Sequence, residues 1–267
     1  MTFWKKASLF MTTALLALCL AVPAFAAGLT VKTSSISEDV VNVAVPYIAG
    51  SRGGSEVDAK VNGAVFDVID GQLEALLPAA DRSAFKASHD KGGTTSSRLA
   101  YHKELVKFTS DSVRKANSEV KTAASWYVRS EYEIKSASPR FLSLIQKTTT
   151  YLGGAHDNVV WTTENYDLAT GNPVTLEDLF DPAADYKTRL TTLIGWQQTG
   201  VARLKQHMTG RAGAVVKPVQ VTGNELFYVD KERNLGLVFN PGEIAPVSEG
   251  VILYDLSLND FADLIKL

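Results

Sequence analysis

The chain contains a single cysteine, Cys19, among its 267 residues. This cysteine lies in an apolar N-terminal run that has the pattern of a segment removed on export, so the mature chain would contain none. A disulfide framework and a cysteine nucleophile are therefore excluded after processing. Lipidation is not favoured either, because Leu18 stands where a lipoprotein needs a small residue before its cysteine.

Signatures of common exported hydrolases are also missing. The sequence has no G-x-S-x-G elbow, no H-E-x-x-H zinc helix and no S-x-x-K motif with convincing partners. The four histidines are scattered, and none has another metal ligand at a familiar spacing: His89, His102, His156 and His207. The sequence therefore predicts no enzyme, no metal and no cofactor, with surface or capping roles for the histidines.

The chain also lacks a strong charge of either sign. With 27 basic and 29 acidic residues, its formal net charge is −2. Loss of Lys5 and Lys6 with an N-terminal signal lowers this to −4, because no acidic residue leaves with them. Such mild acidity argues against nucleic acid or anionic lipid as the main partner, and it is compatible with a basic protein partner.

Residues 1–26 have the features of a secretory signal. Two lysines precede the apolar run Ala7–Val22, and Pro23–Ala27 supplies small residues for cleavage after Ala26. The run is shorter than the ~20 residues of a spanning helix, so no stable membrane span is expected after cleavage. We expect a periplasmic, cell-envelope or extracellular protein, with an uncleaved anchor as the alternative.

The mature chain, ordinary in being 45% apolar and 21% charged, alternates between strand and helix patterns. Strands are predicted over residues 29–35, 40–48, 125–135, 141–152, 159–168, 226–230, 235–240 and 251–256. Helices are predicted over residues 56–77, 81–89, 98–120 and 186–208, with a short one after residue 258. Pro46 suggests an edge position or a bulge, and Thr175 with Asp178 forms a capping box.

These elements indicate an α+β fold, with antiparallel sheets in meander and hairpin connections packed against a few helices. We expect a signal peptide over 1–26, a strand–helix region with a helical lobe over 27–124, and an α+β region over 125–267. The hairpin connections make a doubly wound parallel sheet unexpected.

Candidate chemistry gathers around the turn Gly153–Asn158. An imidazole beside a carboxylate, as in His156 and Asp157, can act as a general base or bind a polar ligand. Adjacent residues on an extended backbone point apart, however, which favours a role of His156 in closing the turn. Asn158 completes the polar tip.

Two further sets of side chains allow other interpretations. A carboxylate pair of the glycosidase type could come from Glu131, Glu133 and Glu164, although carboxylates on a strand face are more often solvated. An aromatic and charged recognition surface could come from Tyr127, Arg129, Trp161 and Tyr166, with core packing as the alternative for the tryptophan.

Four motifs of the C-terminal half occur in combination: Tyr151-x-Gly153-Gly154-Ala155-His156, Asn165-Tyr166-Asp167-Leu168-x-Thr170-Gly171, Thr175-Leu176-x-Asp178-Leu179-Phe180 and Leu237–Pro246. Together they resemble the extracytoplasmic domain shared by RsiV-like lysozyme-sensing anti-sigma factors and the non-catalytic part of PdaC-like peptidoglycan deacetylases. Only six residues precede the apolar run, and the chain ends at Leu267. Neither sigma-factor sequestration nor deacetylation is therefore expected.

The resemblance implies an exported domain that recognises a lysozyme-like protein or a peptidoglycan-related ligand. Candidate contact residues are His156, Asp157, Asn158, Glu243, Arg129 and Tyr166. Two alternatives remain: an envelope hydrolase that acts on cell-wall glycan through His156 and acidic neighbours, and a purely structural interaction module.

Overall fold

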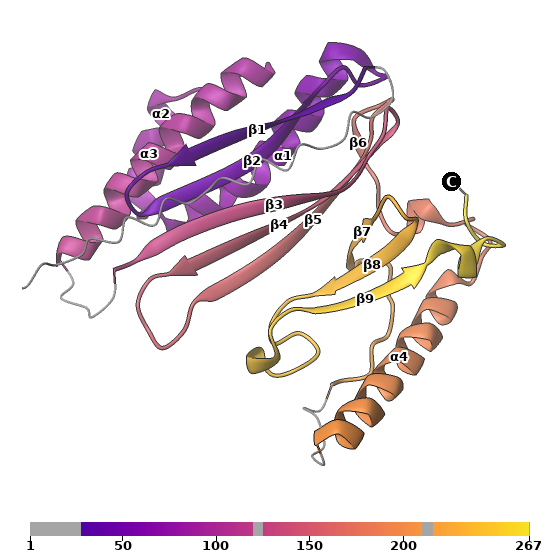
Figure 1. The fold of residues 1–267 in the computed structure, drawn as a ribbon. Coiled ribbons are helices and arrows are strands. Elements are labelled where there is room, and N and C mark those ends of the chain that lie inside the picture. Colours follow the sequence, from indigo (N-terminus) through magenta and orange to yellow (C-terminus); the bar gives the residue numbers. More distant parts are fainter. Residues whose placement is uncertain (1–27, 120–124, 210–215, 267) are drawn as a thin grey trace, which may run out of the picture.

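The structure is a computed structural model that describes residues 28–119, 125–209 and 216–266. It contains a six-stranded sheet, a three-stranded sheet and four α-helices within these ranges, so the predicted α+β class is confirmed. Figure 1 shows α1, α2 and α3 gathered beside β1 and β2, while the smaller sheet and α4 lie beyond β5. None of the helices formed by the described residues is both long and apolar enough to cross a membrane.

Most predicted elements are present, with bounds shifted by a few residues. The strands are β1 (Thr30–Ser37), β2 (Val41–Ala49), β3 (Tyr127–Ala137), β4 (Phe141–Tyr151), β5 (Asn158–Asp167), β6 (Asn172–Pro173), β7 (Leu226–Val229), β8 (Asn234–Phe239) and β9 (Ile252–Ser257). The helices are α1 (Gly54–Leu76), α2 (Ala79–Ser88), α3 (Thr95–Glu119) and α4 (Tyr186–Thr209), with 3-10 turns η1 (Glu177–Leu179), η2 (Val247–Glu249) and η3 (Leu258–Phe261).

The large sheet has the order β1-β2-β3-β4-β5-β6. All its neighbouring strands are antiparallel except β2 and β3, which pair in parallel over Val41–Val43 and Val128–Ser130. This short parallel pair was not predicted. The predicted edge position of Pro46 is wrong for the strand as a whole, since β2 lies between β1 and β3, but β3 pairs only with Val41–Val43 and leaves Pro46 with a strand partner on the β1 side alone.

Helix α1 packs on the sheet through one apolar face and two buried polar side chains. Val65, Phe66 and Ile69 are almost completely buried in the core that α1 shares with β2 and α3. Asn62 hydrogen-bonds both backbone groups of Ile48, at 2.7 and 2.9 Å. Asp58 accepts the backbone N–H of Gly50 at 2.8 Å, so these polar contacts fix where α1 begins relative to the end of β2.

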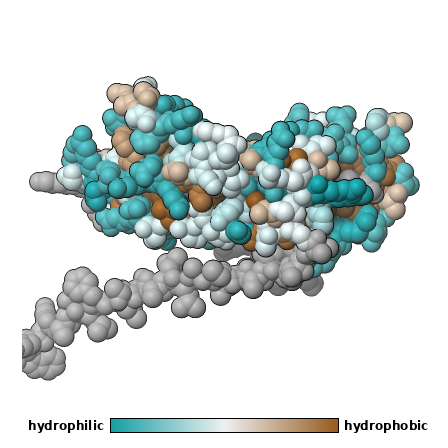
Figure 2. All heavy atoms as spheres, turned by 90° about the horizontal axis from the view of Figure 1, so that it is seen from above, coloured by the Kyte–Doolittle hydropathy of each residue, from teal (hydrophilic) through white to brown (hydrophobic). Residues whose placement is uncertain are grey.

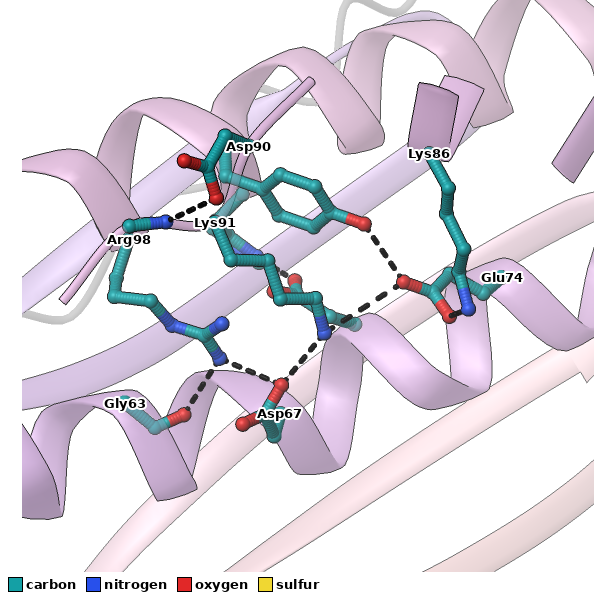
Figure 3. A network of polar contacts seen from close by, with 11 residues as sticks. Gly63, Asp67, Glu74, Lys86, Asp90, Lys91 and Arg98 are labelled. Atoms are coloured by element: carbon teal, nitrogen blue, oxygen red, sulfur yellow. Dashed lines mark hydrogen bonds and ion pairs between the residues drawn. The ribbon is translucent and has the colours of Figure 1, made fainter. Parts of the chain in front are cut away.

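The predicted helical lobe is formed by α2 and α3, and ionic contacts hold it to α1 (Figure 3). Asp67 on α1 lies 2.6 Å from Lys91 Nζ and 2.6 Å from Arg98 Nη2. Burial alone would raise the pKa of Asp67, but the hydrogen bonds from Lys91 and Arg98 outweigh it and lower this pKa. The Asp67 carboxylate therefore stays charged at the contact between α1 and α3.

A second contact of this network centres on Glu74, near the end of α1. Its carboxylate lies 2.7 Å from Lys86 Nζ and accepts the Tyr101 hydroxyl at 2.8 Å. Burial again opposes ionisation, yet these hydrogen bonds hold the pKa of Glu74 below its usual value. Glu74 thereby connects α1 with both α2 and α3.

The smaller sheet, with order β7-β8-β9, forms a second core with α4. Polar side chains of the large sheet accept hydrogen bonds from the backbone of β7 and thereby connect the two sheets. Ser143 Oγ accepts from the Val229 N–H at 3.0 Å, and Thr163 Oγ1 accepts from the Phe227 N–H at 3.0 Å. These contacts satisfy the outer edge of β7, which would otherwise offer unpaired backbone groups.

Two predicted helix starts are confirmed as caps of short turns. Thr175 Oγ1 donates to Asp178 at 2.7 Å, and the Thr175 N–H donates to the same carboxylate at 2.8 Å. The hydrogen bonds from Thr175 lower the pKa of Asp178. Ser257 accepts the Asn259 N–H and begins η3. Each cap starts a single 3-10 turn, shorter than an α-helix.

Several sequence predictions fall outside the described residues. The signal peptide over 1–26 is one of them, and residue 120, the predicted end of the helix over 98–120, is another. The expected division near residue 124 stays a prediction, and the six-stranded sheet takes strands from both sides of it.

Gly236 is expected to tolerate no side chain. A Cβ at this position would lie 2.1 Å from Cζ of Tyr228, its cross-strand partner. The Tyr228 ring is held by its hydrogen bond to Asp255 at 2.6 Å and by Lys135 over its face. Gly236→Ala should therefore lower the free energy of unfolding by about 1–3 kcal/mol, measured by urea denaturation.

Gly71 provides the matched control for this substitution. It is exposed inside α1, and nothing lies within 4 Å of a Cβ built there. Gly71→Ala should raise the free energy of unfolding by roughly 0.5–1 kcal/mol. Equal effects of the two substitutions would contradict the close packing of Tyr228 on Gly236.

Candidate functional site

Strands β3, β4 and β5 present one face to the smaller sheet and the other to the helices. Ile145, on the first face, packs against Tyr228 and Val238, whereas Leu144 belongs to the core beneath α1. The first face continues past Ile145 toward the β4–β5 turn. There it carries the cross-strand pairs Glu131 with Lys147, Arg129 with Thr149, and Tyr127 with Tyr151.

An aromatic and cationic stack occupies the end of this face. The rings of Tyr127 and Tyr151 are stacked, with centroids 6.0 Å apart and planes inclined by 27°. The guanidinium of Arg129 lies 4.9 Å from the centroid of the Tyr127 ring. Arg129 is exposed, and both tyrosines are half-buried. We call Tyr127, Arg129, Thr149, Tyr151 and Asp157 the hairpin surface.

The turn between β4 and β5 adds a carboxylate to the hairpin surface. The Tyr127 hydroxyl donates to Asp157 Oδ2 at 2.8 Å, and this hydrogen bond raises the pKa of Tyr127. Gly153 and Gly154 have φ of 90° and 112°, which side chains strongly disfavour. These glycines let the turn fold back so that Tyr151 Oη reaches the Gly154 carbonyl at 3.1 Å.

His156 and Asn158 are exposed at the tip of this turn. His156 makes no hydrogen bond with any described residue, so closure of the turn by a hydrogen bond from this side chain is absent within that part of the chain, and a packing role stays a prediction. Asp157 is bound to Tyr127 instead. No general-base pair of His156 and Asp157 is formed in this arrangement.

The loop between β8 and β9 borders the same end of the sheet. Asn240 accepts the Trp161 N–H at 2.7 Å and donates to the Trp161 carbonyl at 3.0 Å. Figure 1 shows the β4–β5 turn and the loop with η2 at the same end of the two sheets. Trp161 is half-buried between them and packs against Ile145, Tyr228 and Val238.

Glu243 lies in this loop but contacts a region separate from the hairpin surface. It lines a shallow pocket together with Thr222, Asn224, Glu225 and Leu226. Within the described residues, no hydrogen bond or ion pair joins Glu243 to the hairpin surface. The two loops thus share one end of the fold without forming a single polar site.

Tyr166 lies apart from the other predicted contact residues. It is only 6% exposed and belongs to the helix-facing core, where its hydroxyl donates to Glu164 Oε2 at 2.9 Å. Burial raises the pKa of Glu164 to about 8, against the opposing effect of the Tyr166 hydrogen bond. The pair is a buried feature of the core and is inaccessible to a ligand on the hairpin surface.

The carboxylates considered for glycoside hydrolysis do not converge. Glu131 and Glu133 lie on the face opposite to Glu164 and are paired with Lys147 and Lys135, respectively.

His102 is fully buried against Asp70 between α1 and α3. Among the described residues, no three His, Cys, Asp or Glu side chains are grouped so that they could hold a metal.

The face of the molecule seen from above is mainly hydrophilic, with small and scattered apolar patches (Figure 2). Large contiguous apolar patches are typical of stable protein interfaces. The view from above therefore gives no reason to place a binding site there.

No family model and no curated protein matches this sequence. A solved structure of a DUF3298 family member from Bacteroides fragilis is similar over 90% of this chain and 95% of its own, with a TM-score of 0.59 and 18% identity. Another, a DUF3298 family protein from Pseudomonas aeruginosa, covers 89% of this chain and 94% of its own, with a TM-score of 0.48 and 11% identity. The first likeness shows a shared α+β fold.

Proposed function

We propose that this chain is an exported domain that binds a component of the cell envelope through the hairpin surface. The observation that carries the proposal is the stack of the exposed Arg129 on the half-buried Tyr127 and Tyr151, with Asp157 bound to the Tyr127 hydroxyl. Aromatic and arginine side chains are enriched where proteins recognise partners. Residues on a turn held by a rigid sheet are well placed for such contacts.

The sequence supports export of the chain and an envelope component as its ligand. The signal-like segment of residues 1–26 supports export, and the motif resemblance to RsiV-like and PdaC-like proteins supports an envelope ligand. The ligand is either a lysozyme-like protein or a fragment of peptidoglycan. A binding role is favoured over hydrolysis because the described His156 lacks a carboxylate partner.

Calorimetric titration of the mature chain against lysozymes and against soluble muropeptides tests this proposal. We expect binding to one class, and Tyr127→Ala should weaken it at least tenfold. Tyr47→Ala is the matched control, since Tyr47 is also a half-buried strand tyrosine but lies on β2. Thermal unfolding of both variants separates lost binding from lost stability.

Absence of binding to either class would refute the proposal. Equal losses of binding in the two tyrosine variants, in parallel with equal losses of stability, would instead indicate a structural module. Release of reducing sugar from cell-wall glycan, with loss of this release in His156→Ala, would indicate a hydrolase.

A further inference from the structure

We infer that Arg129 holds a carboxylate of the ligand, and that this ligand is a peptidoglycan fragment with a free carboxylate on its peptide stem. The inference rests on the proposed function, because it names the ligand class of the same hairpin surface. It selects between the two classes that the proposed function leaves open.

The first step is the contact that restricts the Arg129 side chain. Its guanidinium lies over the Tyr127 ring, and Tyr127 is itself held by Tyr151 on one side and by Asp157 at its hydroxyl. A guanidinium that covers an aromatic face keeps its N–H donors at its rim. This contact restricts part of the motion of the Arg129 side chain, so less conformational freedom is lost when those donors bind a ligand.

The second step is that no carboxylate among the described residues forms an ion pair with the Arg129 guanidinium. Its neighbour Glu131 pairs with Lys147 at 3.2 Å, and Asp157 accepts from Tyr127. No ion pair or hydrogen bond joins the Arg129 side chain to another described residue. An exposed and positioned guanidinium without an internal acid suits a planar anion, which it binds through two parallel hydrogen bonds.

The third step concerns the surroundings of that anion. Thr149 pairs with Arg129 across the strands, and Val159 pairs with Thr149 on the next strand. The anion would thus lie beside a hydroxyl, an aliphatic side chain and two tyrosines, with the Asp157 carboxylate at the Tyr127 hydroxyl. Such a mixed surface suits a peptide linked to sugar, whose carboxylate would contact Arg129 and whose neutral hydroxyl and amide donors would contact Asp157, whereas a basic protein would leave Arg129 facing charge of the same sign.

Titration of the mature chain with matched ligands tests the inference. The ligands are a muropeptide with free stem carboxylates, the same muropeptide with amidated carboxylates, and the glycan without its stem. We expect the free carboxylate form to bind most tightly. Arg129→Gln should weaken its binding by roughly tenfold to a hundredfold and remove the advantage over the amidated form. Arg129→Lys should weaken it less, because charge remains while the planar fork is lost.

Arg140→Gln is the matched control. Arg140 is exposed in the turn between β3 and β4, at the opposite end of the same strands, and its loss should leave all three affinities unchanged. Glycerol phosphate is added as a competitor, since phosphate offers similar acceptor geometry. Competition by glycerol phosphate at concentrations where acetate has no effect would assign the site to phosphate and overturn the inference.

The outcomes separate the inference from the proposed function. Binding of a muropeptide or a lysozyme that is insensitive to amidation and to Arg129→Gln would overturn the inference and leave the proposed function standing. Absence of binding to every ligand, lysozymes included, would remove both.

Discussion

His102→Phe should lower the free energy of unfolding by about 3–5 kcal/mol, since it breaks a fully buried pair and leaves a carboxyl without a partner. His102 Nδ1 lies 2.6 Å from Asp70 Oδ1, and both side chains are 0% exposed. The imidazole also packs on Phe66, with ring centroids 5.2 Å apart. Phenylalanine preserves that ring contact but gives Asp70 no hydrogen bond. Urea denaturation of the mature chain measures the loss.

The double variant with Asp70→Leu and His102→Phe should recover much of this stability, because replacing both partners of a buried pair removes the unpaired group. His89→Phe serves as the matched control. His89 is half-buried and stacks on Phe85, with centroids 4.1 Å apart, so its replacement should change stability by less than about 1 kcal/mol. A loss of that small size for His102→Phe would contradict the role of the pair.

Glu164→Gln should change how stability depends on pH. Burial raises the pKa of Glu164 to about 8 in the folded chain, from its ordinary value of 4.5. Between these values the folded state binds more protons than the unfolded state, so stability falls as pH rises. One such group contributes a slope of at most about 1.4 kcal/mol per pH unit. Glutamine accepts the same Tyr166 hydrogen bond without ionising, so the variant should be the more stable form at pH 8.

Chemical denaturation of wild type and Glu164→Gln from pH 5 to 9 measures this effect as the difference between the two curves. Glu133→Gln is the matched control, since Glu133 is exposed on the opposite face of the same sheet. Its curve should run parallel to that of the wild type. A constant difference between wild type and Glu164→Gln across the whole range would show that Glu164 ionises freely in the fold.

Local patterns predicted the individual elements because their causes are local. The three- and four-residue spacing that runs from Val57 to Leu73 lies on α1, and the alternation from Tyr127 to Lys135 lies on β3. The Thr175 cap and the Gly153–Gly154 turn also depend on neighbouring residues alone. The parallel pairing of β2 with β3 could not be predicted in this way, because it depends on how the intervening helices pack.

The residues of the hairpin surface could be predicted only in part, because their arrangement depends on the pairing register of β3 with β4. Arg129, Tyr127 and Asp157 were all candidates, but their meeting with Tyr151 depends on an irregularity in β3 between Ile134 and Ser136. Without it, continuing the pairing of Ala137 with Leu142 would place Tyr127 opposite Leu152. A shift of one residue exchanges the faces of a strand. The burial of Tyr166 was missed for a different reason, since alternation groups it with Glu164 without saying which face of the sheet the helices cover.

The parallel pair also sets the order in which the chain can fold. The β1–β2 hairpin and the β3–β4–β5 meander each join strands that are close in sequence. Val41 and Val128, in contrast, meet only after a loop that contains all of α1, α2 and α3 has closed. Closing so long a loop is entropically costly, and contacts of this range slow folding. The ionic contacts that hold the helical lobe to α1 shorten the part of that loop that remains flexible, so packing of the three helices favours the pairing of β2 with β3.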